Sequence, residues 1–137
     1  MLMFRKMTID DLDKIYKDIE LRPLLTIPPI GKKFGVVVDL DNCIVGGVTG
    51  YIEGENATIQ KLIMKAQKDY TIYEDGLIRS LIHTLDLDGV RFLFVEPLQD
   101  VNLYTNIGFK KFNSCMANSA NNTFYIDLKA FFCEQNC

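Results

Sequence analysis

The sequence predicts a mixed α/β domain of the α+β kind, with one central sheet of about seven mostly antiparallel strands and helices on both faces. Apolar residues recur with helical spacing in two segments, residues 9–19 and 77–85. Between these segments lie three runs rich in β-branched residues and separated by turn residues. A short apolar run follows at residues 91–95, which is typical of a central strand buried on both faces.

Length, composition and charge set the limits of the interpretation. The chain has 137 residues, of which 48% are hydrophobic and 24% charged, so one domain with its own core is expected. We place this domain at residues 1–128 and a tail at residues 129–137. A net charge of −3 creates no positive field for nucleic acid. Because no apolar run reaches the length of a membrane span, we expect a cytoplasmic protein that binds neither membranes nor nucleic acid.

The cysteines indicate neither a disulfide framework nor a zinc site. Cys43, Cys115, Cys133 and Cys137 lack the paired spacing of zinc ligands, and the single histidine, His83, lies on a predicted helix. A domain of this size needs no covalent crosslink to support its core. We therefore expect four unlinked thiols and no metal.

The N-terminal elements are predicted from a capping pattern and from proline. A strand at residues 4–7 precedes a helix that begins at Thr8, because Thr8 and Asp11 form a capping-box pattern. The apolar residues at three- and four-residue steps are expected to face the core: Ile9, Leu12, Ile15 and Ile19. Three prolines within residues 21–33 predict a loop with one helical turn.

Three antiparallel strands are predicted next. Residues 34–40 and 43–51 form a hairpin around Asp41 and Asn42, which are typical hairpin-turn residues. A second turn leads into a strand at residues 57–65, where apolar and polar residues alternate.

The C-terminal half predicts a crossover and a return to antiparallel strands. A helix starts at Gly76 and ends at the turn dipeptide Asp88-Gly89. The apolar run at residues 91–95 then lies parallel to the strand before that helix. The remaining predicted elements are a helix at residues 100–107 capped by Gly108, and strands at residues 109–112 and 123–128.

This order of elements resembles the GNAT acetyltransferases over about residues 2–128. The most specific stretch is LYTNIGFKKF, in which Tyr104 precedes the pair Gly108-Phe109 by four positions, as in that family. The resemblance implies the GNAT fold, acetyl-CoA as cofactor and an amine as acceptor.

The resemblance also implies catalytic roles. Tyr104 corresponds to the tyrosine that protonates the departing thiolate of coenzyme A as general acid. The alternative is that Tyr104 packs its helix against the sheet with its hydroxyl at the surface. Glu96, at the end of the fifth strand, is the best candidate for the general base. Its alternative is a solvated carboxylate ahead of Pro97.

The cofactor site implied by the family lies around the end of strand four and the start of the next helix. There, backbone amides at a helix N-terminus hold the pyrophosphate. The corresponding residues are Leu62, Ile63 and Met64 on the strand, and Gly76, Leu77, Ile78, Arg79 and Ser80 on the helix.

The phosphate loop departs from the family pattern. Tyr73 stands where Gln or Arg is usual, and Ile78 where a second Gly or Ala is usual, so a branched side chain would crowd the phosphate. Asp75 could cap the helix, and its carboxylate would then accept the amide hydrogen bonds that a pyrophosphate would otherwise receive. In a second alignment, a turn at residues 68–71 meets the phosphates. The compensating cations would be Lys65, Lys68 and Arg79.

The sequence is therefore compatible with three functions. The first is an acetyl-CoA-dependent N-acetyltransferase acting on a small-molecule or peptide amine. The second is a GNAT-like binding module that has lost the phosphate loop. The third is an interaction domain or homodimer that uses apolar residues 21–30 and an exposed Phe131-Phe132 pair. Residues 21–30 could instead shape the acceptor pocket, or form a lid that packs Leu24, Leu25 and Ile27 onto the core.

Overall fold

The computed structural model describes residues 1–65, 69–97, 101–112 and 123–135. Its elements in chain order are β1 (Leu2–Lys6), α1 (Ile9–Lys17), the 3₁₀ turn η1 (Arg22–Leu25), β2 (Lys32–Leu40), β3 (Cys43–Glu53), β4 (Asn56–Met64), α2 (Tyr70–Leu87), β5 (Phe92–Val95), α3 (Val101–Ile107), β6 (Lys110–Lys111), β7 (Phe124–Asp127) and α4 (Leu128–Gln135).

The strands form one seven-stranded sheet in the order β1-β2-β3-β4-β5-β7-β6. Neighbouring strands are antiparallel except β4 and β5, which pair in parallel through the crossover helix α2. The predicted α+β architecture and its mixed, mostly antiparallel sheet are thus confirmed. At the hairpin between β2 and β3, Asp41 and Asn42 have φ angles of 52° and 70°, as a type I′ turn requires.

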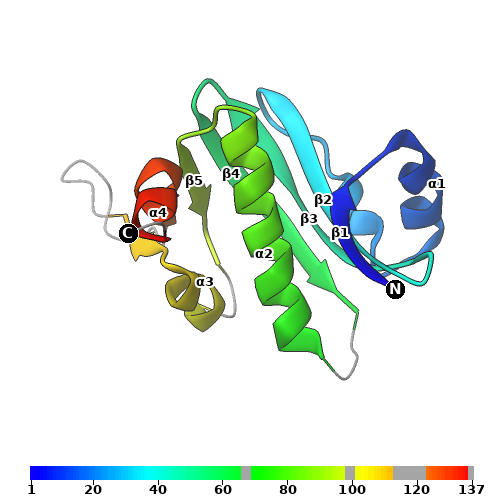
Figure 1. Cartoon of the computed structure of the whole chain (residues 1–137). Helices are drawn as coiled ribbons and strands as arrows, with labels where there is room; N and C mark the ends of the chain where they lie inside the picture. The colour runs from blue at the N-terminus through cyan, green and yellow to red at the C-terminus, as the bar shows by residue number, and fades with distance from the viewer. Residues whose placement is uncertain (66–68, 98–100, 113–122, 136–137) are drawn as a thin grey trace.

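The sheet separates two cores. Helix α2 crosses one face, and α3 and α4 lie on the same side, whereas α1 and η1 cover the other face near β1 to β3 (Figure 1). Residues of β2 alternate between the cores: Val36 and Val38 face α2, while Val37 joins Ile15 and Leu24 beneath α1. The second core is small, so the α1 side covers only part of the sheet.

The buried face of α1 differs from the predicted one. Ile9 and Ile19 are 85% and 78% exposed, and Leu12 is also exposed. Among the predicted set only Ile15 is buried, and it shares the inner face with Asp11. The physical reason is that Asp11 serves both the helix cap and Arg5 of β1, which turns that side of the short helix towards the sheet.

The segment set apart as a tail contains α4. Phe131 and Phe132 are partly buried against the larger core, and the Phe132 ring lies 6.3 Å from that of His83 on α2. The exposed phenylalanine pair that would support an interaction domain is therefore not found, because both rings are partly buried. In the lid segment, Leu24 is fully buried as expected, but Ile27 is 86% exposed.

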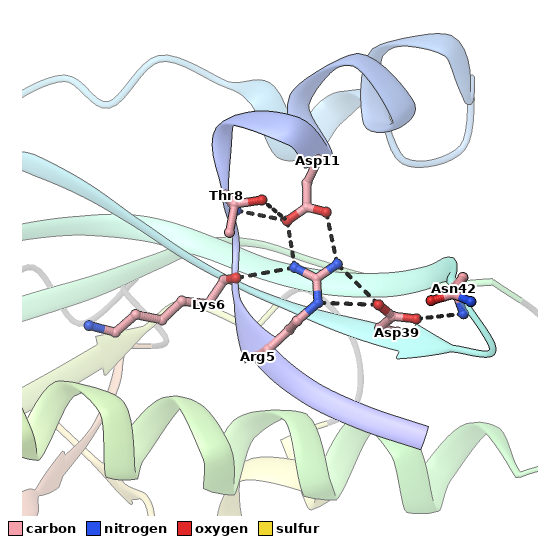
Figure 2. Close-up of polar contacts among 6 residues, drawn as sticks. All are labelled: Arg5, Lys6, Thr8, Asp11, Asp39 and Asn42. Atoms are coloured by element: carbon pink, nitrogen blue, oxygen red, sulfur yellow. Dashed lines mark hydrogen bonds and ion pairs between the residues drawn. The ribbon is translucent and has the colours of Figure 1, made fainter. Parts of the chain in front are cut away.

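Arg5 joins three elements through its guanidinium (Figure 2). Its Nη1 and Nη2 donate to the two carboxylate oxygens of Asp11 on α1 at 2.7 and 2.9 Å. Its Nε and Nη2 also donate to Oδ2 of Asp39 on β2 at 3.2 and 3.1 Å. Asp39 Oδ1 in turn accepts the backbone N–H of Asn42 in the hairpin turn at 2.9 Å.

Asp11 completes the predicted capping box. Its carboxylate accepts the backbone N–H of Thr8 at 2.7 Å, and the box is closed in both directions. Hydrogen bonds from Arg5, with smaller contributions from Thr8, lower the pKa of Asp11 from 3.8 to about 2, although burial acts in the opposite direction.

Asp11→Asn should lower the free energy of unfolding by about 2 kcal/mol at neutral pH, because it removes a charge-paired and largely buried carboxylate. The folded-state pKa lies below the ordinary value, so the stabilisation is complete above about pH 4 and disappears as the pH falls towards 2. Urea unfolding of both proteins between pH 2 and 7 measures this effect.

Asp13→Asn is the matched control. Asp13 pairs with Lys17 on the exposed side of the same helix, so its loss should change stability by less than about 0.5 kcal/mol. Equal effects of the two substitutions would contradict the assigned role of Asp11.

Candidate functional site

The parallel strands β4 and β5 part near the middle of the sheet. They pair from Asn56–Phe92 to Ile59–Val95, and there β5 ends. Strand β4 continues to Met64, still paired with β3 on its other side. From residue 60 to 63, the β4 edge that faced β5 therefore has no strand partner among the described residues. Such an edge presents N–H and C=O groups to an extended ligand.

A β-bulge lies at the point of separation. Gly50 of β3 is opposite Ile59, but the next β3 residue, Thr49, is opposite Lys61, so β4 has one residue more than β3 there. Ile59 before the bulge and Leu62 after it both face the α2 core. Gln60 and Lys61 between them both face the opposite side of the sheet.

A cavity of about 640 Å³ opens on that opposite side. Its walls come from the loop after η1, the centre of β3, the bulged part of β4, the end of β5 and the start of β7. The lining residues are Thr26, Pro29, Tyr51, Thr58, Ile59, Gln60, Lys61, Phe94, Val95, Glu96 and Thr123. The segment that follows η1 thus contributes to the cavity, as one of its sequence interpretations expected.

The cavity has both polar and apolar walls. Glu96 is exposed and accepts a hydrogen bond from Thr123 Oγ1 at 3.2 Å. Oε1 of Gln60 is buried and has no hydrogen-bond donor among the described residues. Lys61 supplies a cation at the exposed rim. The cavity therefore combines one carboxylate and one ammonium group with the hydroxyl groups of Tyr51 and three threonines.

The two predicted catalytic residues lie in different surroundings. Glu96 lies in the cavity wall, where a base acting on a bound molecule would have to be. Tyr104 is on α3, is only 3% exposed, and its ring packs edge-on against Phe109 at 5.3 Å. It is not among the residues that line the cavity. Its burial agrees with packing of α3 against the sheet, and its role as general acid stays a prediction.

The predicted start of the crossover helix at Gly76 is wrong. Helix α2 begins at Tyr70, so Gly76 lies within it rather than at its N-terminus. Asp75 does not cap the helix, because its Oδ1 pairs with Nε of Arg79 one turn later at 2.7 Å. A Cβ on Gly76 would come within 2.6 Å of the Phe4 ring. The glycine thus permits close packing of α2 against β1.

The other residues of this helix that were predicted to bind the phosphates also lie inside α2 rather than at its start. Leu77 and Ile78 are fully buried in the α2 core, so Ile78 does not fill a cleft as expected. Ser80 is half-buried in the middle of the helix. Amides this far inside a helix are bonded to the preceding turn and cannot hold a phosphate.

The second alignment, with a turn at residues 68–71, agrees better with the actual helix start. The N-cap residue Asp69 makes no side-chain cap bond, so helix geometry leaves the first-turn amides of Thr71 and Ile72 without intrahelical acceptors. Beside this turn, a hollow of about 230 Å³ lies between α2 and α3. Its lining includes Thr71, Glu74 and Asp75.

The proposed compensating cations are largely engaged. Lys65 Nζ contacts Asp18 Oδ2 at 2.7 Å, and this hydrogen bond raises the pKa of Lys65 and lowers that of Asp18. Arg79 pairs with Asp75. Lys68 lies outside the described residues, as do Cys115 and Cys137.

Leu62, Ile63 and Met64 lie in the part of β4 beyond the end of β5, and their role in cofactor binding stays a prediction. The sequence interpretation did not single out Tyr51, Phe94 or Thr123. A signal for Phe94 was available, because the alternation of residues 92–96 places Phe94 and Glu96 on one face of the strand.

Comparison with solved structures identifies the architecture. The chain is 13% identical to the ribosomal-protein-S18-alanine N-acetyltransferase of Escherichia coli, with a TM-score of 0.70, over 93% of this chain and 94% of that one. It is 13% identical to the PaiA N-acetyltransferase of Thermoplasma acidophilum in complex with coenzyme A, with a TM-score of 0.67, over 93% and 99% of the chains. An acetyltransferase of the GNAT family from Staphylococcus aureus matches at 11% identity and a TM-score of 0.68, over 93% and 99%.

These matches show that the chain has an acyltransferase-type α+β fold. The particular fold is that of the GNAT acetyltransferases, as the sequence resemblance implied. No family model matches the sequence, and a search of curated proteins finds no relative. Within the described residues, no helix has the length and apolar character to cross a membrane, and no group of three or more His, Cys, Asp or Glu residues could hold a metal ion.

Gly76→Ala tests the packing role of this glycine. Alanine is the better helix former, but its methyl group would displace the Phe4 ring, so we expect a net loss of about 1–2 kcal/mol in the free energy of unfolding. Chemical denaturation measures this loss. Adding Phe4→Leu should recover part of it, and a Gly76→Ala protein more stable than the natural one would contradict the assignment.

Proposed function

We propose that this protein is a member of the GNAT family that transfers the acetyl group of acetyl-CoA to a primary amine. The observation that carries the proposal is the β4 edge at residues 60–63, which extends beyond the end of β5 beside a cavity that contains Glu96. An extended acyl carrier and an amine could meet there from opposite sides of the strand. The cytoplasmic location expected from the sequence belongs to this proposal.

The described residues fit the acyl half of acetyl-CoA better than the nucleotide half. The backbone of Leu62 and Ile63 would hold the extended arm by strand-like hydrogen bonds, and the amides of Thr71 and Ile72 in the first turn of α2 would hold the diphosphate. Acidic Asp69 and Asp75 lie close to that helix start, and Lys65 and Arg79 are already paired. Bound acetyl-CoA would supply an activated thioester carbonyl.

Glu96 is the proposed base on the acceptor side. An amine attacks only when its nitrogen is unprotonated, and an exposed carboxylate in the cavity wall can accept the proton that the nitrogen gives up. Thr123 donates a hydrogen bond to Glu96 and so orients the carboxylate.

Tyr104 is the proposed acid. In the reaction, the amine nitrogen bonds to the acetyl carbon, the carbon–sulfur bond breaks, and the amine loses a proton to Glu96. Tyr104 would donate a proton to the leaving thiolate, which completes the balance.

A binding module without catalytic activity is the second candidate. The acidic residues near the start of α2 favour it, because negative charge beside a helix N-terminus opposes an anionic ligand. Burial of Phe131 and Phe132 argues against an interaction domain built on the C-terminal segment.

Calorimetric titration with acetyl-CoA separates the two candidates. The transferase should bind acetyl-CoA with a Kd of about 1–100 μM, that is, about −8 to −5.5 kcal/mol. Free coenzyme A should compete with acetyl-CoA for the site. The affinity for acetyl-CoA should fall only modestly as the salt concentration rises, because the described cations near α2 are paired. Absence of heat at millimolar acetyl-CoA would leave the binding module as the function.

Tyr104→Phe should lower kcat by at least about tenfold while leaving the Kd for acetyl-CoA unchanged, because only the proton donor is lost. The release of coenzyme A, followed with a thiol reagent, measures the rate. Tyr16→Phe removes a hydroxyl from the exposed side of α1 and serves as the control. An unchanged rate in Tyr104→Phe would remove Tyr104 from the mechanism.

A further inference from the structure

Four aromatic rings gather on β5, on β7 and at the residue that follows β6. The Phe94 ring lies 5.8 Å from Phe112, 6.3 Å from Tyr125 and 6.4 Å from Phe92. Tyr125 also contacts Phe112 at 5.8 Å and Phe92 at 6.5 Å. Phe112 is 42% exposed, and the other three are partly buried. We name these four residues the aromatic cluster.

The aromatic cluster lies on the same face of the sheet as the cavity. Phe94 is opposite both Thr58 of β4 and Tyr125 of β7, and residues opposite one another point to the same face. The alternate residues Leu93 and Val95 point into the α2 core instead. Phe94 is the only cluster member that also lines the cavity. It therefore joins the apolar cluster to the polar groups of the site.

The distance along β5 relates this ring to the proposed base. Phe94 and Glu96 are two residues apart on one strand face, which places their backbone positions about 6.6 Å apart. Tyr51 adds a second aromatic wall from β3. A molecule that contacts both Phe94 and Glu96 would thus carry its amine only a few bonds away from a flat apolar group.

We propose that the acceptor is a primary amine attached to an aromatic group, which packs on Phe94 and Tyr51 while the amine meets Glu96. This inference rests on the proposed function and specifies its substrate class. Aromatic rings in offset or edge-on contact attract one another beyond simple burial. The same walls also carry the hydroxyl groups of Thr26, Thr58 and Thr123, so the preference for a ring comes from Phe94 and Tyr51.

The charges of the cavity agree with this class of acceptor. The Glu96 carboxylate attracts the ammonium form of the amine during association.

Tryptamine is the direct binding probe, because the chain contains no tryptophan and the indole fluorescence comes from the ligand alone. Its fluorescence anisotropy should show saturable binding to the natural protein. Phe94→Leu keeps an apolar residue but removes the ring, so the Kd should rise about tenfold. Phe92→Leu is the matched control, since it removes a cluster ring that does not line the cavity, and the Kd should stay within about twofold.

Tyr51→Leu is a second test that leaves the aromatic cluster intact, and it should also weaken tryptamine binding. Circular dichroism melting identifies any variant that is not folded at the assay temperature. The inference is overturned if tryptamine does not bind the natural protein. It is also overturned if Phe92→Leu weakens binding as much as Phe94→Leu does while Tyr51→Leu has no effect.

Turnover separates the inference from the proposed function. With acetyl-CoA, kcat/KM for tryptamine and phenethylamine should exceed that for kanamycin and for a serine-initiated peptide by at least about tenfold. Equal or better turnover of the non-aromatic amines would overturn the inference and leave the transferase function standing. Ring-dependent tryptamine binding without turnover of any amine would support the aromatic site and contradict the transferase.

Discussion

One additional residue on β4 determines which side chains reach the cavity. If β3 and β4 were paired without the bulge, side chains would alternate regularly, and Lys61 would point into the apolar core rather than towards the cavity. The bulge allows Ile59 and Leu62 to remain in that core while Gln60 and Lys61 both face the opposite side. Directly beyond the bulge, β5 ends and leaves the β4 edge unpaired. Packing, cavity and open edge therefore depend on the same short stretch of strand.

Much of the fold could be predicted from local patterns. The strand runs, the hairpin at Asp41-Asn42 and the buried stripe of α2 all follow from side-chain periodicity and turn chemistry. The start of α2 could not be predicted in this way, because Gly76 has the composition of a turn. Its actual cause is the ring of Phe4, a residue distant in sequence that only the packed structure brings close.

The candidate site was predicted in part. Glu96 could be found because a carboxylate at a strand end is visible in the sequence, and Leu62, Ile63 and Met64 lie on β4 beyond the end of β5, where their cofactor role stays a prediction. Tyr51 and Thr123 could not be found, since their proximity to Glu96 depends on strand register. The inner face of α1 was mispredicted for a related reason: apolar spacing alone does not show that a buried aspartate will pair with an arginine on another element.

The first strand connects both layers of the protein although it lies at the outer edge of the sheet. Phe4 packs against α2 on one face, and Arg5 holds α1 on the other, because neighbouring side chains of a strand point in opposite directions. Proteolytic trimming within the first seven residues would therefore loosen two helices at once. A purification tag whose removal also cleaves within these residues would therefore destabilise the fold.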